Sequence, residues 1–215
     1  MDMNEVRQWH RDALGASAVE ALKKNDFDAV YFSGREQAIE YVMGFVREGA
    51  EVGFGGSMTV AGLGIQAKAK AKGAVLLDHG DPNLSPEQKA DMRRRQQLCD
   101  LFLSSTNALT LDGFLVNVDG NGNRTNAMSF GPKKVIVVAG TNKICADEEA
   151  ADQRIRQFAA PLNNKRLGTK NPCVEKGVCC DCKGKTRICK VYSTLRRKPS
   201  ATDMTVVIIG EDLGF

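Results

Sequence analysis

Five cysteines gather in the last quarter of the chain, and four of them could bind a metal. Their spacing leaves five, two and six residues between successive thiols, and a fifth cysteine, Cys180, follows directly after the second. Lysines and arginines in the same stretch favour the thiolate form that metals bind. The predicted ligands are Cys173, Cys179, Cys182 and Cys189. The pattern has neither two CxxC pairs nor the ferredoxin run of close cysteines, so it indicates a metal without naming it, with free redox-switching thiols as the alternative.

A glycine-rich turn, Gly53–Thr59, is the second candidate site. Glycines end a predicted strand, hydroxyl residues follow, and a helix begins. Backbone N–H groups in such a turn can approach an anion closely. The turn lacks the lysine of a phosphate-binding loop and the spaced glycines of the dinucleotide fingerprint. A tight strand-to-helix turn capped by Ser57 is the alternative. The predicted ligand-binding residues are Gly55, Gly56, Ser57, Met58 and Thr59.

A third candidate is the polar segment from Asn107 to Arg124, which is rich in Asn, Gly and Asp. Glycines permit unusual backbone angles, and Arg124 could hold a carboxylate in a bidentate pair. Asp119 could orient a hydroxyl or act as an acid–base group. A polar turn held by its own Asn and Asp side chains is the alternative. The predicted binding residues here are Asn107, Asn117, Gly120, Asn123 and Arg124.

Two further residues could serve the same site. Lys143 follows a buried strand and could attract an anion, and Glu211 follows the last strand and could act as a catalytic carboxylate beside Asp119. His79 also follows a strand, but we interpret it as a surface histidine.

Alternating strand and helix patterns must position these residues. Short β-branched or apolar runs predict strands over Asp28–Phe32, Glu51–Phe54, Ala74–Asp78, Asn107–Thr110, Phe114–Val118, Lys134–Ala139 and Met204–Ile209. Helical spacing predicts helices over Met3–Lys24, Arg35–Arg47, Thr59–Lys72, Asp147–Phe158 and from Pro86 to about Ser104. The last of these begins with a capping box at Ser85 and Gln88. The dipeptide Asp112-Gly113 predicts a hairpin turn.

The alternation predicts an α/β fold with a mostly parallel sheet flanked by helices, in one domain spanning 1–215. In such sheets the carboxyl ends of the strands form one edge, where ligands bind. We therefore expect the glycine-rich turn and the Asn107–Arg124 segment to meet. Residues 165–198 form a Cys-rich basic insertion before the last strand.

The composition is that of an ordinary globular protein, with 42% hydrophobic and 26% charged residues. No apolar run approaches the roughly 20 residues of a membrane-spanning helix, and the first residues do not resemble a secretory signal, so we expect a cytoplasmic protein without a membrane partner. The net charge of +4 conceals a strongly basic segment, Lys165–Lys198. We interpret this segment as a solvated surface and not as a nucleic-acid site.

Four stretches together resemble the LUD (lactate-utilisation) family, also called DUF162. They are GGSMT, STNALTLDGFLVNVDGNGNR, FGPKKVIVVAGTNKI and the terminal VIIGEDLGF. The resemblance implies a Rossmann-like fold similar to that of ribose-5-phosphate isomerase, glucosamine-phosphate deaminase and coenzyme A transferases. In related isomerases a segment similar to Asn107–Asn123 carries a catalytic aspartate, but this chain has Asn107 at that position, which cannot act as an acid or base.

The resemblance implies a role in the oxidation of lactate to pyruvate, beside partners that carry iron–sulfur clusters or flavin. This redox setting makes an iron–sulfur cluster the first expectation for the cysteines and zinc the alternative. The first functional hypothesis is therefore a redox-associated protein that binds a small anionic metabolite. An isomerase or transferase acting on a sugar phosphate or acyl-coenzyme A is the second, and a non-catalytic scaffold subunit is the third. The sequence leaves open whether the chain forms a homo-oligomer.

Overall fold

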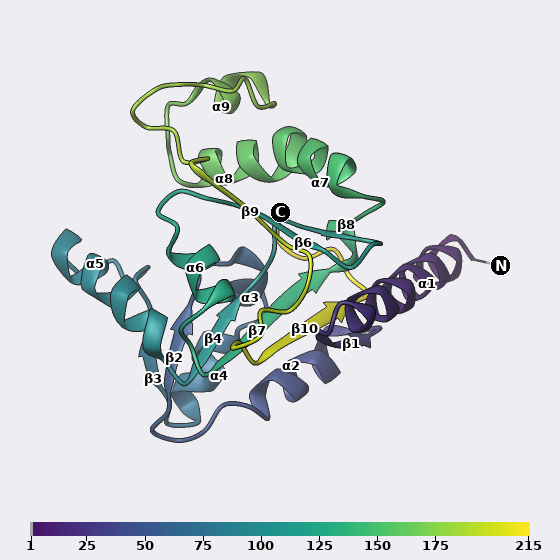
Figure 1. The fold of residues 1–215 in the computed structure, drawn as a ribbon, viewed down its shortest axis with the longest axis horizontal. Helices are drawn as coiled ribbons and strands as arrows, with labels where there is room; N and C mark the ends of the chain where they lie inside the picture. Colours follow the sequence, from purple (N-terminus) through teal and green to yellow (C-terminus); the bar gives the residue numbers. More distant parts are fainter. Residues whose placement is uncertain (1) are drawn as a thin grey trace.

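A six-stranded parallel sheet lies at the centre of the protein (Figure 1). The computed structural model describes residues 2–215. In sheet order the strands are β1 (Asp28–Phe32), β10 (Met204–Ile209), β7 (Lys134–Gly140), β4 (Leu101–Ser104), β2 (Glu51–Phe54) and β3 (Val75–Leu77). All six residues of β10 are buried, as its continuous apolar sequence predicts for an interior strand. The expected α/β fold with a parallel sheet is confirmed.

Helices cover both faces of this sheet, and the alternation of side chains along the strands supplies both cores. On β7, Ile136 and Val138 pack in the core beneath α2 (Arg35–Met43), α3 (Met58–Gly62) and α4 (Ile65–Ala71). The alternate residues, Val135 and Val137, pack on the other face with side chains of α1 (Met3–Lys24) and α6 (Asn123–Ser129).

A second, smaller sheet lies beside the first. Its order is β8 (Ile144–Cys145), β5 (Ala108–Thr110), β6 (Leu115–Asp119) and β9 (Val191–Leu195). The predicted hairpin joins β5 to β6, and Gly113 in its turn has a φ of +80°. A Cβ at Gly113 would lie 2.5 Å from the backbone of Ala21, so the hairpin packs directly on α1. Neither β8 nor β9 was predicted from the sequence.

A helical layer covers the second sheet, and the cysteine-rich segment connects this layer to β9 (Figure 1). It consists of α7 (Glu148–Arg154), a π-helical turn (Ile155–Ala159), α8 (Ala160–Arg166) and α9 (Pro172–Lys176). Of these, α7 packs against β5 and β6. The helix predicted over Asp147–Phe158 therefore exists but continues further.

Three further predicted helices were wrong in extent. The helix expected over Arg35–Arg47 ends at Met43, as α2. The helix expected from Pro86 to Ser104 ends early, as α5 (Pro86–Arg95) and a 3-10 turn (Gln96–Leu98), because Leu101–Ser104 is the interior strand β4. Its apolar residues are buried on both faces of the sheet, a tertiary effect that outweighs the helical spacing. The helix expected over Thr59–Lys72 is divided into α3 and α4 at Gly64, whose φ is +66°.

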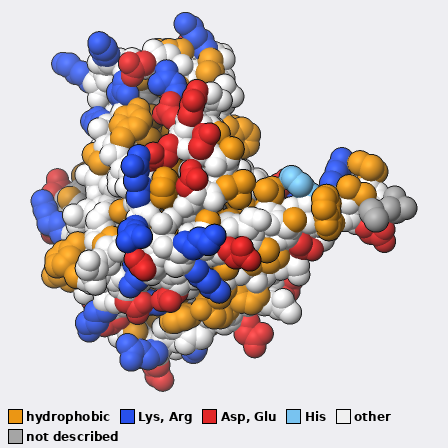
Figure 2. All heavy atoms as spheres, turned by 45° about the vertical axis from the view of Figure 1, so that its right-hand side comes forward, with side chains coloured by type: hydrophobic (Ala, Val, Ile, Leu, Met, Phe, Trp, Pro, Cys, Tyr) orange, Lys and Arg blue, Asp and Glu red, His pale blue; other side chains and the backbone are white. Residues whose placement is uncertain are grey.

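The first helix extends away from the body of the protein at one end (Figures 1 and 2). Hydrophobic side chains lie along this arm in Figure 2, and Trp9 is 67% exposed. Among residues 2–215, no helix combines the length and the apolar character that crossing a membrane requires.

Candidate functional site

A cavity of about 400 Å³ lies where the parallel strands end. One wall comes from segments that follow β2, β4, β6 and β7, and the opposite wall from α8 and from Lys185–Lys190 of the cysteine-rich segment. The volume suits a small metabolite. The glycine-rich turn and the Asn107–Arg124 segment thus meet in one pocket, as expected from the fold.

The glycine-rich turn lines the pocket directly after Phe54, the last residue of β2. Gly56 adopts a φ of +72°, in the left-handed region that favours glycine. At Gly55 a Cβ would lie 2.7 Å from Ser104 Oγ, so a side chain there would displace Ser104. Ser57 then caps α3, because its Oγ accepts a hydrogen bond from Val60 N at 3.2 Å. Met58 and Thr59 also line the cavity, although the Thr59 hydroxyl donates to Leu213 O at 3.2 Å.

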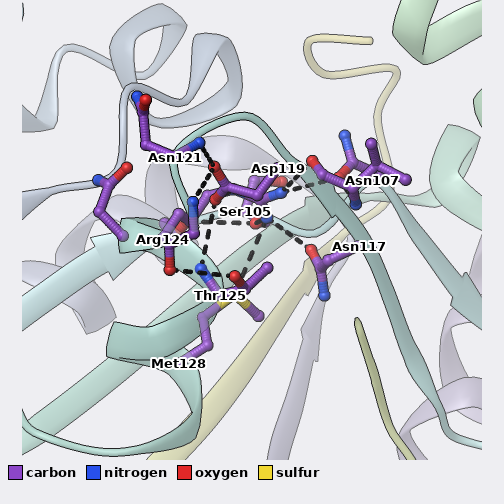
Figure 3. Close-up of polar contacts among 12 residues, drawn as sticks. Ser105, Asn107, Asn117, Asp119, Asn121, Arg124, Thr125 and Met128 are labelled. Carbon is purple, nitrogen blue, oxygen red and sulfur yellow. Dashed lines mark hydrogen bonds and ion pairs between the residues drawn. The ribbon is translucent and has the colours of Figure 1, made fainter. Parts of the chain in front are cut away.

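Arg124 lies at the centre of a buried polar network (Figure 3). Its Nη1 donates to Ser105 O at 3.0 Å and to the side-chain oxygen of Asn117. Its Nη2 donates to Asn107 Oδ1 and to Val118 O, both at 2.9 Å. All four Nη hydrogens therefore have protein acceptors. Arg124 thus stabilises the loop. It could form the predicted bidentate contact with a ligand carboxylate only if it gave up two of these hydrogen bonds.

Asp119 organises the same loop instead of projecting a free carboxylate into the pocket (Figure 3). Its Oδ1 accepts from the backbone N–H groups of Asn121 and Gly122, at 3.0 and 3.1 Å. Its Oδ2 accepts from Thr125 N at 3.3 Å and lies 3.6 Å from Arg124 Nε. The carboxylate thus fixes the start of α6, and this geometry favours a positioning role over the predicted catalytic one.

The remaining predicted residues of this loop divide into two groups. Asn107, Gly120 and Asn123 line the cavity. Asn117 does not: it is 1% exposed and its side-chain oxygen accepts from Arg124, beneath the pocket.

Glu211, the second predicted catalytic residue, lies outside the pocket. Its carboxylate accepts from Arg35 N at 2.8 Å and Arg35 Nε at 2.7 Å, and pairs with the guanidinium. These bonds, chiefly the side-chain hydrogen bond from Arg35, lower the pKa of Glu211. Glu211 therefore stabilises the start of α2, and the structure does not bring it to Asp119.

Lys143 lines the pocket as predicted, and it is 3% exposed. Its Nζ donates to Ser105 Oγ at 3.0 Å and to Thr106 O at 3.2 Å. Burial lowers the pKa of Lys143 to about 7, and the positive charges of Arg154 and Arg124 contribute.

His79 is not the surface residue we expected, because it lines the pocket beside the glycine-rich turn. The side-chain amide of buried Gln96 donates to Phe54 O and Leu77 O, at 3.0 and 2.6 Å. With both amide hydrogens engaged, Gln96 Oε1 accepts from His79 Nδ1 at 3.2 Å, which leaves Nε2 as an acceptor. Burial, followed by the charge of Arg93, lowers the pKa of His79 and keeps the ring neutral.

Positive charge dominates the pocket wall. Among its lining residues Asp119 is the one acidic side chain, whereas seven are basic. The basic residues are Arg93, Arg124, Lys143, Arg166, Lys185, Arg187 and Lys190. Five of these were missed as site residues: Arg93 lies on α5, and the others belong to the basic segment that we interpreted as solvated surface. The signal for those four was the local excess of Lys and Arg in Lys165–Lys198.

The four predicted metal ligands share one neighbourhood around α9. Burial raises the pKa of Cys173, and the nearby Cys182 and Cys179 raise it further. Burial likewise raises the pKa of Cys189 to about 11, with Cys179 adding to the effect. Cys189 also lines the pocket, so the cluster adjoins the cavity. Within residues 2–215, no three His, Cys, Asp or Glu side chains converge in the geometry of a metal site.

The protein is a Rossmann-like α/β protein with a basic cavity at the carboxyl edge of its sheet. The sequence matches the LUD domain over residues 16–209, and the chain belongs to this family. The fold is similar to a crystal structure of a DUF162 family protein from Deinococcus radiodurans, with a TM-score of 0.50 and 14% identity over 93% of this chain and 98% of that one. No curated protein matches the sequence.

Proposed function

We propose that the pocket binds a small anionic metabolite, a 2-oxo or 2-hydroxy acid, and that the protein serves lactate utilisation in the cytoplasm. The observation that supports this proposal is the wall of the cavity, where seven basic residues accompany a single acidic side chain among the described lining residues. Asp119 is already engaged by Arg124 and by backbone N–H groups, so the net positive charge remains available to a ligand. A cavity of about 400 Å³ has room for a small acid.

Arg93 lines the cavity, and we propose that it binds the carboxylate. In the described part of the chain, no hydrogen-bond acceptor reaches its buried Nε. A buried N–H without an acceptor carries a desolvation cost that a bound carboxylate would relieve through a charge-assisted hydrogen bond.

Calorimetric titration with pyruvate and L-lactate tests the proposal, with Arg93→Gln as the variant. We expect roughly tenfold weaker binding for Arg93→Gln, the loss typical of one charge-assisted hydrogen bond. The neighbouring Arg94 supplies the control, since it is 77% exposed and pairs with Asp91, so Arg94→Gln should bind as the wild type does. Failure of both acids to bind would refute the proposal. Binding of ribose 5-phosphate or acetyl-coenzyme A instead would favour the isomerase or transferase hypothesis.

We also propose that Cys173, Cys179, Cys182 and Cys189 bind a metal, as an iron–sulfur cluster or as zinc. The support is their spacing within one short segment, Cys173–Cys189, which ends at the pocket wall with Cys189. The four thiols would close around the ion on binding and so fasten the segment that forms one wall of the pocket. A cluster at this place would exchange electrons with an iron–sulfur or flavin protein partner.

Anaerobic purification followed by metal and sulfide analysis tests the ligand set. Cys179→Ser should lose the metal, whereas Cys180→Ser, at the adjacent position, should retain it. Iron with stoichiometric sulfide would favour the cluster, and one zinc per chain would favour a structural role. A protein without any metal, or equal loss in both variants, would contradict the proposal.

A further inference from the structure

Lys143 is a buried lysine that faces the pocket without a counter-ion. It follows β7 at the edge where ligands bind in sheets of this kind, and it is 3% exposed. The charged groups that influence it are both cations, Arg124 on α6 and Arg154 on α7. The pocket carboxylate, Asp119 on β6, pairs with Arg124. A permanently charged ammonium is therefore poorly accommodated at this position.

The hydrogen bonds around Nζ fit a neutral amine. Nζ has two acceptors, Ser105 Oγ at 3.0 Å and Thr106 O at 3.2 Å. The Ser105 hydroxyl donates to Thr106 O at 3.3 Å, so its oxygen is free to accept from Lys143. An ammonium has three N–H groups, whereas a neutral amine has two N–H groups and a lone pair. Two acceptors satisfy the neutral amine completely and leave its lone pair unused.

The pKa of Lys143 also favours the neutral amine. Burial, with the charges of Arg154 and Arg124, lowers the pKa of Lys143 to about 7. A substantial fraction of the amine is then unprotonated at neutral pH, which is the condition under which lysines act as nucleophiles toward carbonyl groups.

We propose that Lys143 is a nucleophile that forms an imine with the carbonyl carbon of a 2-oxo acid bound in the pocket. The inference rests on the proposed function, because the basic wall must first hold the carboxylate of that acid. The C–N bond forms as the lone pair attacks the carbonyl carbon, and the carbonyl oxygen leaves as one water molecule that carries both amine protons. A 2-hydroxy acid has no carbonyl carbon to attack, so it binds without this step. Lys143 thus separates 2-oxo acids from 2-hydroxy acids.

Reductive trapping tests the inference on the full chain. The protein is incubated with pyruvate and sodium cyanoborohydride, and the product is analysed by intact mass and peptide mapping. We expect an adduct on Lys143 equal in mass to one pyruvate, less water, plus two hydrogens. Near neutral pH the unprotonated fraction of Lys143 should exceed that of a lysine of ordinary pKa by on the order of a thousandfold, so the adduct should form first on Lys143. L-lactate should give no adduct.

Two variants make the outcome specific. Lys143→Arg removes the nucleophile, and it should abolish the adduct. Lys134→Arg is the control, because Lys134 pairs with Asp203 away from the pocket, and it should leave trapping unchanged. Peptide mapping of the wild type decides the question even if Lys143→Arg does not fold.

The experiment separates this inference from the proposed function. Pyruvate that binds in calorimetry but leaves Lys143 unmodified, or that modifies lysines indiscriminately, would refute the nucleophile and leave the anion site intact. Absence of both binding and adduct would refute the two together.

Discussion

Two arginines perform the same task in different regions of the molecule. Arg124 ties together the loop below the pocket, and Arg187 ties together the cysteine-rich segment above it. Arg187 donates to Cys189 O, Cys182 O and Asp181 Oδ1, each at 2.7 Å, and to the Tyr192 hydroxyl at 3.1 Å. Each arginine donates to two backbone carbonyls and to two side-chain oxygens. The two networks differ in the exposure of the acidic partner, because the Asp119 side chain is 9% exposed and the Asp181 side chain 60%.

Burial reverses the effect on the arginine itself. Burial lowers the pKa of Arg124 despite the nearby charge of Asp119. Hydrogen bonds to Asp181 and Tyr192 raise the pKa of Arg187, because little burial opposes them. In the buried Asn107–Arg124 loop, a polar group that loses its partner remains unsatisfied, so removal of a partner is costly. In the exposed cysteine-rich segment, water can replace a lost hydrogen bond. We call the Asn107–Arg124 loop the floor of the pocket and the cysteine-rich segment its roof. The floor is therefore rigid and the roof adaptable.

The largest expected effect comes from breaking the rigid floor. Arg124→Met leaves the oxygens of Asn107 and Asn117 without their donor and leaves Asp119 as an unpaired buried charge. We expect a loss of about 3–5 kcal/mol in the free energy of unfolding, measured by urea denaturation. The matched variant, Arg187→Met, should cost several-fold less. Equal losses in the two variants would show that burial does not distinguish the networks.

A smaller effect should appear in the dependence of stability on pH, through Lys143. The folded-state pKa of about 7 lies below that of an unfolded lysine, so between the two values the unfolded chain binds the extra proton. Stability therefore rises with pH in this window and falls as pH decreases toward 7.

Lys143→Met removes this contribution and serves as the reference. From about pH 7.5 to about pH 9, the wild type should gain about 2 kcal/mol of unfolding free energy relative to the variant, measured by denaturation at each pH. Parallel profiles for the two proteins would mean that Lys143 titrates normally, and would also weaken its assignment as a nucleophile.

The sequence predicted the elements around the pocket better than the chemistry of the site. The turn at Gly55-Gly56, the hairpin at Gly113 and the strand Lys134–Gly140 follow from local signals, and all three appear. The strand Leu101–Ser104 was hidden because its apolar residues continue the helical spacing of α5, and only its place inside the sheet distinguishes it. Local patterns report secondary structure, but burial is a property of the whole fold.

The same limit explains the site residues. Arg124 and Asp119 were singled out correctly as members of one loop, yet their partners, Ser105 O and Thr125 N, depend on how that loop folds back. Glu211 was placed at the ligand edge because it follows the last strand. In the structure its carboxylate instead accepts hydrogen bonds from Arg35 on the neighbouring α2. His79 enters the pocket through Gln96, which no sequence pattern connects to it.

A metal bound to the four cysteines would make the roof more rigid. Removal of that metal by a chelator should therefore loosen the segment. Chelation should increase proteolytic cleavage within residues 172–190 by about tenfold, which corresponds to about 1.4 kcal/mol of local stability. The main sheet should keep its unfolding midpoint, because its two cores lie elsewhere. Cleavage that is indifferent to the chelator would mean that the cysteines do not fasten the segment.

The smallest effect belongs to the exposed ion pair of the roof. Arg187 and Asp181 lie 2.7 Å apart at the surface, where salt screens charges and water competes for the same bonds. Asp181→Asn should leave the unfolding midpoint unchanged, and high salt should affect wild type and variant alike. Asp119→Asn supplies the comparison, because its carboxylate is buried among three backbone donors and should lower the midpoint at any ionic strength. If Asp181→Asn lowered the midpoint as much as Asp119→Asn, the exposed network would contribute as much to stability as the buried one. That outcome would contradict the distinction between a rigid floor and an adaptable roof.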